Sequence, residues 1–549
     1  MSNRNLVLIF DQYQRARLAF VQAISDLAAR QQNTELLIKG GTLDLLKPLL
    51  ADPCIQIQQC AAIAVGRLVH YSSTIAESCI NQGFISILLS SIYTGNKYQK
   101  RAGLFVLRSI CRHSPHCALQ VINAGGLQAL IGCLEDFESG VKEAAAWGIG
   151  YISRHSKSLA QTCVDAGAVP LLLLCLQEPE ITLKQITTSA LSDIAKHGME
   201  LAQSVVDAGV VPYLVKNLSN TDEKLKKQIL AGLSSCAKHS IDLAEVVVEA
   251  EIFPTVLLHL AHPCPGVRRN AACLVRDIVK HSLELTQLVV NTGGIGALME
   301  VLFQKDSGGA ILPTITAIGY ISAHSEHLAM SVIGCKVIVL LAELLETSTD
   351  DPLLAITVWA IGQIGKHSAD HSQAVAAANI FPRLIVLYES DKSSQDLKYK
   401  CKNTLKLCLQ KCLLVDALEP LLYSAPFQIL KYVLGQYSKL LPQDSKARRL
   451  FVTTGGLKKV QMIEAKPGTT LFEYISVINA CFPDEIVRYY SPGYPETLLD
   501  KVEQYSPQMM SVLREQDQNE NEAQTDILNI DDQTSTDEED EDKSFRNNM

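Results

Sequence analysis

A pattern that returns every 42 residues limits the architectures available to this chain. The pattern is marked by a histidine that follows a basic residue or alanine, and it runs through much of the 549 residues. The intervals are 42 or 43 residues, and the histidines are His113, His155, His197, His239, His281, His324 and His367. Tyr71 and Arg30 extend the series towards the N-terminus. A period of this length indicates supersecondary units that bury their apolar faces only by stacking on their neighbours.

One unit, at residues 167–209, shows what each period contains. Residues 171–176 are almost wholly apolar, which predicts a short buried helix. Over residues 183–194 the apolar positions recur every three or four residues, which predicts a longer amphipathic helix. His197 follows this helix, and an acidic residue, Glu200, suits the start of the next one. Each unit is therefore expected to have three helices of unequal length.

Three helices in a 42-residue period are typical of armadillo and HEAT repeats. We predict an all-α, armadillo/HEAT-like, right-handed superhelical solenoid over residues 1–412, with about nine repeats of 42 residues. The period breaks after this point, so residues 413–507 are expected to form a C-terminal helical cap. Residues 508–549 are polar and acidic and are expected to form a disordered acidic tail.

Charge is distributed unevenly between these parts. The formal net charge of the sequence is −9, but residues 515–549 carry 13 acidic and 2 basic residues. The preceding residues carry 45 acidic and 47 basic residues and are nearly neutral. A strongly basic body, as many nucleic-acid-binding proteins have, is therefore excluded, and we expect no nucleic-acid partner.

The cysteines and the apolar segments bear on the compartment. The 16 cysteines form no C-x-x-C pair, and five that fall in apolar helical patterns are Cys133, Cys163, Cys175, Cys236 and Cys273. We interpret them as reduced, buried small hydrophobic residues. The apolar run at residues 6–10 is shorter than the core of a signal peptide, and no uninterrupted apolar stretch reaches 18 residues. We expect a cytoplasmic protein without a membrane partner.

Motifs of catalysis are missing from the sequence. It contains no P-loop, no H-E-x-x-H and no G-x-S-x-G. No cluster of cysteines or carboxylates completes a metal site around its histidine pairs. We therefore predict no enzyme, no cofactor and no metal. We interpret each in-phase histidine as closing the long helix of its unit and bonding the terminal carbonyls of that helix.

A solenoid of this kind binds partners along the concave surface built from its long third helices. In importin-α-like armadillo proteins these helices carry a ladder of Trp and Asn that clamps a basic peptide. Here only Trp147 and Trp359 hold the Trp position, and the Asn position begins with Asp26. The residues that follow in the Asn position are our candidate concave-groove partner-binding residues: Arg67, Ser109, Tyr151, Asp193, Ser235, Asp277, Tyr320 and Gln363. Asp, Arg and Tyr do not all donate and accept as Asn does, which disfavours nuclear import.

Two further expectations follow from this register. We expect Trp147 to be a core residue beside the groove, so that truncation to alanine costs about 3–5 kcal/mol. A solenoid without catalytic motifs can serve as a structural scaffold. The alternative is an armadillo adaptor that binds peptide cargo or adhesion partners, as importins and catenins do.

Several blocks resemble the sperm-associated antigen 6 family. Within the repeats they include FDQYQRARLAFVQAISDLA and CLEDFESGVKEAAAWGIGYISRH, and outside the repeats they include LPQDSKARRLFVTTGGLKKVQMI and EIVRYYSPGY. The last two are the specific ones, because they lie outside the generic repeat. The resemblance covers roughly residues 1–507, and the acidic tail is not part of the family pattern.

The resemblance implies a non-enzymatic structural protein of the central apparatus of cilia and flagella. It implies a cytoskeletal location in the axoneme, on a central-pair microtubule, and a role in central-pair stability and motility. The implied partners are other central-apparatus proteins, tubulin contacted directly or indirectly, and further copies of the chain in a homo-oligomer.

Overall fold

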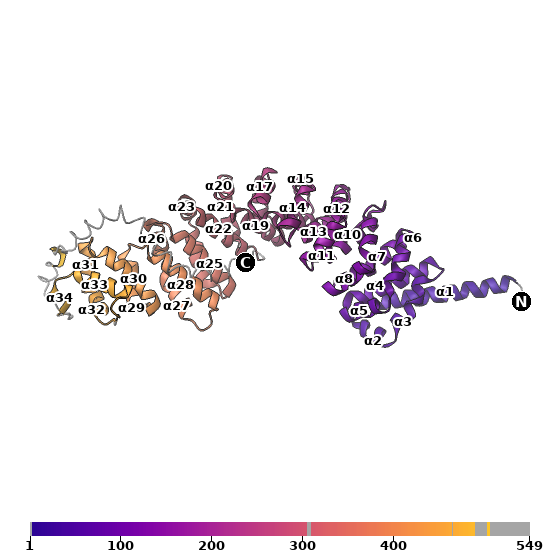
Figure 1. Cartoon of the computed structure of the whole chain (residues 1–549), viewed down its shortest axis with the longest axis horizontal. Helices are drawn as coiled ribbons and strands as arrows, with labels where there is room; N and C mark the ends of the chain where they lie inside the picture. The colour runs from indigo at the N-terminus through magenta and orange to yellow at the C-terminus, as the bar shows by residue number, and fades with distance from the viewer. Residues whose placement is uncertain (1–2, 305–308, 464, 489–501, 505–549) are drawn as a thin grey trace. The chain divides into compact units, whose positions relative to one another are not determined.

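The computed structural model describes residues 3–304, 309–463, 465–488 and 502–504. By internal contacts the chain divides into two compact units, Met1–Leu328 and Ala329–Met549. The regular secondary structure of the described residues consists of α-helices and short 3₁₀ helices, as the repeat pattern predicted (Figure 1).

The longest helix of each repeat is its third, with 14 to 17 residues. The third helices are α4 (Ile55–Tyr71), α7 (Lys97–Cys111), α10 (Ser139–Ser153), α13 (Ile181–Ala195), α16 (Glu223–Ala237), α19 (Pro265–Val279), α22 (Ile311–His324), α25 (Asp351–Gly365) and α28 (Gln395–Leu409). In the first unit they pack against one another in chain order, from α1 (Asn3–Ala28) to α22 (Figure 1). In the second unit α25 packs against α28. Their apolar faces form the core.

Two shorter helices precede each third helix. The first helices have nine residues: α5 (Ser73–Asn81), α8 (Pro115–Asn123), α11 (Lys157–Asp165), α14 (Met199–Asp207), α17 (Ile241–Glu249), α20 (Leu283–Asn291), α23 (Glu326–Gly334) and α26 (Ala369–Ala377). The second helices are α6 (Phe84–Thr94), α9 (Gly126–Leu134), α12 (Ala168–Gln177), α15 (Val210–Asn217), α18 (Phe253–Leu260), α21 (Gly294–Phe303), α24 (Val337–Thr347) and α27 (Ile380–Glu389). Between α1 and α4 the chain forms η1 (Gln31–Asn33), α2 (Thr34–Lys39), α3 (Thr42–Leu46) and η2 (Pro48–Ala51).

A residue in the left-handed backbone region joins the first helix to the second. Gly167 and Gly209 adopt φ of 83° and 81° there, which glycine does without strain. In three repeats another residue holds this position: Glu251, Lys336 and Asn379 have φ of 57°, 61° and 52°. A side chain makes this conformation less favourable, so these three joints are strained relative to the glycine joints.

Helices continue through the described part of the segment predicted as a cap. They are α29 (Val415–Ser424), α30 (Phe427–Leu440), α31 (Ser445–Thr453), α32 (Gly456–Gln461), α33 (Thr470–Ala480) and α34 (Asp484–Arg488). Helix α30 packs against α28, and α33 packs against α30. The buried rings of Tyr437 and Phe451 join α30 to α31, with centroids 4.6 Å apart. The predicted tail lies outside the described residues, and the domain boundaries stay predictions.

All sixteen cysteines are free thiols in the structure, and eleven of them are buried. Burial raises the pKa of the Cys163 and Cys175 thiols to about 11, so both remain protonated at neutral pH. Cys273, which we expected to be buried, is half-buried on α19. Among the described residues, no three His, Cys, Asp or Glu side chains are placed to hold a metal ion.

No single helix in the described ranges is long and apolar enough to span a membrane. Five pairs of helices, each bent by 72–82°, satisfy the length and composition criteria only when the two helices are taken together.

Candidate partner-binding site

The in-phase histidines connect each repeat to the one before it. His197 donates from Nε2 to the carbonyl oxygen of Ser153, the last residue of α10, at 2.7 Å. Five more histidines bond a helix-terminal carbonyl in the same way, at 2.6–2.9 Å: His113 to Val69, His155 to Cys111, His239 to Ala195, His281 to Ala237, and His324 to Val279. Tyr71 does so through its hydroxyl, which donates to Ala29 O. The prediction that each histidine bonds its own helix was wrong, because the acceptor belongs to the preceding third helix.

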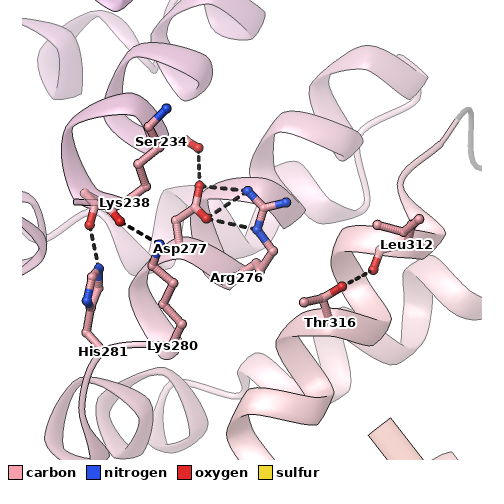
Figure 2. Close-up of polar contacts among 9 residues, drawn as sticks. Ser234, Lys238, Arg276, Asp277, Lys280, His281, Leu312 and Thr316 are labelled. Atoms are coloured by element: carbon pink, nitrogen blue, oxygen red, sulfur yellow. Dashed lines mark hydrogen bonds and ion pairs between the residues drawn. The ribbon is translucent and has the colours of Figure 1, made fainter. Parts of the chain in front are cut away.

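Basic residues beside these histidines also reach across repeats. Lys280 Nζ donates to the carbonyl oxygen of Lys238 at 2.6 Å, next to the bond from His281 to Ala237 (Figure 2). Two neighbouring residues of one repeat therefore bond the carbonyl of the last residue of α16 and that of the capping residue after it, which the helix itself leaves without a donor. Burial lowers the pKa of both Lys238 and Lys280. These contacts fix the position of one third helix against the next.

The eight predicted groove residues lie one per third helix, from α4 to α25. Six of them are half-buried and reach the surface: Arg67, Tyr151, Asp193, Ser235, Tyr320 and Gln363. The other two, Ser109 and Asp277, are only 1% and 3% exposed. Ser109 donates from its hydroxyl to Phe105 O within its own helix, at 2.7 Å.

Asp277 holds two third helices together instead of facing solvent. Its Oδ2 accepts a hydrogen bond of 2.6 Å from Ser234 Oγ on α16 (Figure 2). Its Oδ1 lies 2.8 Å from Nη2 of Arg276 on the same helix. A buried carboxylate needs such partners, so the Ser234–Asp277–Arg276 contacts stabilise the packing of α16 against α19.

Partly buried lysines accompany the Asn-position residues of two other repeats. Lys196 Nζ lies 2.6 Å from Oδ1 of Asp193, and Lys366 Nζ lies 2.7 Å from Oε1 of Gln363. Both pairs are three residues apart on one helix face. The surface near these Asn positions is thus polar, with both charge signs represented.

The surface of α7 and α10 has a different chemistry, because aromatic rings and arginines alternate on it. The guanidinium of Arg108 lies 5.0 Å from the ring centroid of Phe105 and 5.9 Å from that of Trp147. Trp147 stacks on Tyr151 at 5.3 Å, and the guanidinium of Arg154 lies 5.8 Å from the Tyr151 ring. We call these five residues the arginine–aromatic cluster. Trp147 is half-buried in it, so the prediction that Trp147 is a core residue was wrong.

A cleft of about 400 Å³ opens beside this cluster, lined by residues of α4, α7 and α10. Ile63, Phe105, Arg108 and Glu143 are among them. Burial lowers the pKa of Arg108, whose cation is held between two rings. Phe105 and Arg108 were not among the predicted site residues, although Phe105 stands 42 residues before Trp147 and follows from the period.

Comparison with known proteins fits this geometry. The family model described as Armadillo/beta-catenin-like repeat matches residues 114–154 and 199–238. These two segments of the chain are armadillo repeats, and the all-α solenoid around them has the armadillo fold. Armadillo repeats mediate protein–protein interactions, which agrees with a partner-binding surface along the third helices.

Sperm-associated antigen 6 of Homo sapiens and that of Mus musculus are each 62% identical to this chain over 129 residues. The match covers 24% of this chain and 25% of each relative, so it spans about a quarter of the length of these curated relatives. An engineered protein of known crystal structure is similar in fold, with a TM-score of 0.62 at 20% identity. That similarity covers 74% of this chain and 99% of the engineered protein.

Proposed function

We propose that this armadillo protein is a non-enzymatic structural scaffold of the axonemal central apparatus, required for central-pair stability and ciliary or flagellar motility. The observation that carries the proposal is the 62% identity to sperm-associated antigen 6 over 129 residues. The armadillo scaffold family is typically non-enzymatic, which supports the same reading. The proposed partners are other central-apparatus proteins, tubulin directly or indirectly, and further copies of the chain.

The third-helix surface supports a binding role. The arginine–aromatic cluster combines apolar area with the half-buried cation of Arg108, and residues of this kind dominate the binding energy of protein interfaces. The histidine bonds hold successive third helices in a fixed register, so the surface is organised before a partner arrives. We propose that the six half-buried groove residues and the cluster bind protein partners.

Localisation tests the proposal most directly. The full chain, tagged and expressed in motile ciliated cells, is expected in isolated axonemes and on the central pair by cryo-tomography. Cells without the protein are expected to have unstable central pairs and impaired beating. A protein that stays diffuse in the cytosol and is absent from axonemes would overturn the proposal.

Two variants test whether the arginine–aromatic cluster itself contacts the partner. Arg108→Gln removes the half-buried cation of the arginine–aromatic cluster and is expected to reduce recovery of the protein with axonemes. Lys216→Gln removes one positive charge from an exposed position on the second helix α15 and is expected to leave recovery unchanged. Equal recovery of both variants would exclude the cluster as a partner contact.

The alternative is an adaptor that binds peptide cargo or adhesion partners, and the observation that favours it is the presence of aromatic rings beside the cleft. Pull-down with basic localisation peptides distinguishes the two functions. Tight binding of such peptides, lost in Tyr151→Ala, would support the adaptor. Absence of binding would leave the scaffold as the better explanation.

A further inference from the structure

A basic pocket of about 310 Å³ lies in the second unit, where the end of α28 meets α30 and α33. Three lysines line it: Lys411 follows α28, and Lys431 and Lys439 lie on α30. All three are exposed. None of the described residues that line the pocket is acidic, and in the described ranges no carboxylate forms an ion pair with these lysines.

The walls of this trilysine pocket are held in place by neighbouring contacts. Gln436 is 3% exposed, and its side-chain amide donates to Cys412 O at 3.0 Å, which ties α30 to the segment after α28. Gly435 brings α33 close, because a Cβ at this position would lie 3.0 Å from Cε2 of Tyr474. Tyr432 also lines the pocket, with its ring 4.9 Å from Lys431 Nζ. The pocket therefore offers three cations and two tyrosines on a packed frame.

Three uncompensated cations around one cavity repel one another and attract an anion of matching length. The sequence contains one such anion, six consecutive carboxylates at residues 537–542. We propose that the trilysine pocket binds this acidic segment of the same chain. The proposal goes beyond the scaffold function, since it assigns a role to residues outside the pattern of the related family.

The length of the chain permits this contact. Gln504 is the last described residue, and the neighbouring Glu503 lies 3.3 Å from Arg449 on α31. Helix α31 joins α30, the helix that carries Lys431 and Lys439, through the rings of Tyr437 and Phe451. The acidic segment begins more than 30 residues after Gln504. A chain of that length spans up to about 100 Å when extended, far more than the width of a few packed helices.

Zero-length carbodiimide cross-linking of the dilute full-length protein tests the proposal. It joins a lysine amine to a carboxylate in direct contact, and peptide mass spectrometry identifies the pair. We expect residues 537–542 to be joined to Lys411, Lys431 and Lys439, with a yield that falls at least tenfold in 0.5 M salt because the contact is ionic. Cross-links spread evenly over the lysines of the second unit would overturn the proposal.

Matched triple variants control for net charge. Replacing Lys411, Lys431 and Lys439 by glutamine is expected to abolish the cross-linking of the acidic segment. Replacing Lys446, Lys458 and Lys466, three exposed lysines of the same unit outside the pocket, is expected to leave the pocket cross-links intact. Equal loss in both variants would mean that the segment follows net charge and not the pocket.

A tail variant keeps the test decisive if the pocket variant fails to fold. Exchanging the six carboxylates of residues 537–542 for their amides is expected to increase acetylation of the three pocket lysines and to leave that of Lys458 unchanged. Unchanged acetylation of the pocket lysines would contradict the proposal. Mixing protein of normal and heavy isotope content identifies contacts between molecules, and exclusively mixed-isotope cross-links would show that the occupant is a second copy and overturn the assignment to the same chain.

Discussion

His197 lies on one repeat, and its hydrogen-bond acceptor, the carbonyl oxygen of Ser153, ends the third helix of the preceding repeat, 2.7 Å away. The imidazole thus supplies the donor that a helix C-terminus lacks within itself. Repetition of this bond along the first unit couples the end of one third helix to the end of the next third helix.

Removing this donor should destabilise the protein measurably. His197→Ala leaves the Ser153 carbonyl without its partner in a half-buried site and is expected to lower the free energy of unfolding by about 1–3 kcal/mol. Urea denaturation followed by circular dichroism measures the change. His116→Ala, at an exposed position outside the series, should stay within about 0.5 kcal/mol of the parent. Equal effects of the two variants would contradict the role assigned to His197.

The burial of these histidines also predicts a loss of stability in mild acid. Burial lowers the pKa of His197, His239 and His281 below the ordinary value of about 6.5. The unfolded chain then binds protons at a higher pH than the folded chain does. The stability that these groups contribute is therefore fully present above about pH 6.5 and is lost as the pH falls through their folded pKa values.

Urea denaturation at pH 7.5 and at pH 5.0 measures this dependence. The parent protein is expected to be less stable at the lower pH. The variant with glutamine at His197, His239 and His281 should show a smaller difference between the two pH values, whereas His116→Gln should behave like the parent. The same difference in all three proteins would show that other groups carry the pH dependence.

Trp147 tests the difference between a core residue and a surface anchor. Since its side chain is half-buried, Trp147→Ala is expected to cost about 2 kcal/mol in place of the 3–5 kcal/mol expected for a fully buried ring. The lost contact with Arg108 is part of that cost. If thermal or urea denaturation shows that the free energy of unfolding falls by more than about 3 kcal/mol, Trp147 contributes as a core residue does, which would contradict this prediction.

The strained joint at Glu251 offers a stabilising substitution. Glu251→Gly relieves a side chain in the left-handed region and is expected to raise the free energy of unfolding by about 1 kcal/mol. Glu249→Gly, at the last residue of α17, has the opposite expectation, a loss of about 0.5–1 kcal/mol, because glycine is unfavourable in a helix. Opposite shifts in melting temperature would bear out the pair, and equal shifts would contradict it.

Sequence periodicity predicted the all-α repeat and the order of its helices, because the spacing of the apolar positions follows helix geometry directly. It did not identify the acceptor of His197, since a period shows that residues are equivalent but not which neighbour each one bonds. It also placed Ser109 and Asp277 with the groove residues, although both are buried. Their burial depends on how tightly adjacent third helices pack. That packing cannot be inferred from the presence of a serine or an aspartate at a repeat position. The period relates Phe105 to Trp147, but it does not show that the side chain of Arg108 contacts both rings.

The histidine bond has a consequence for how a chain of this type can change in length. His155 to His281 each lie 44 residues after the carbonyl they bond, but His324 lies 45 residues after Val279 and still bonds it at 2.7 Å. One additional residue between two anchoring points is therefore absorbed without loss of the bond. Insertions between the end of one third helix and the histidine of the next repeat should be tolerated as long as both anchors keep their places. Whole 42-residue cassettes could be added or removed with every remaining helix end still capped.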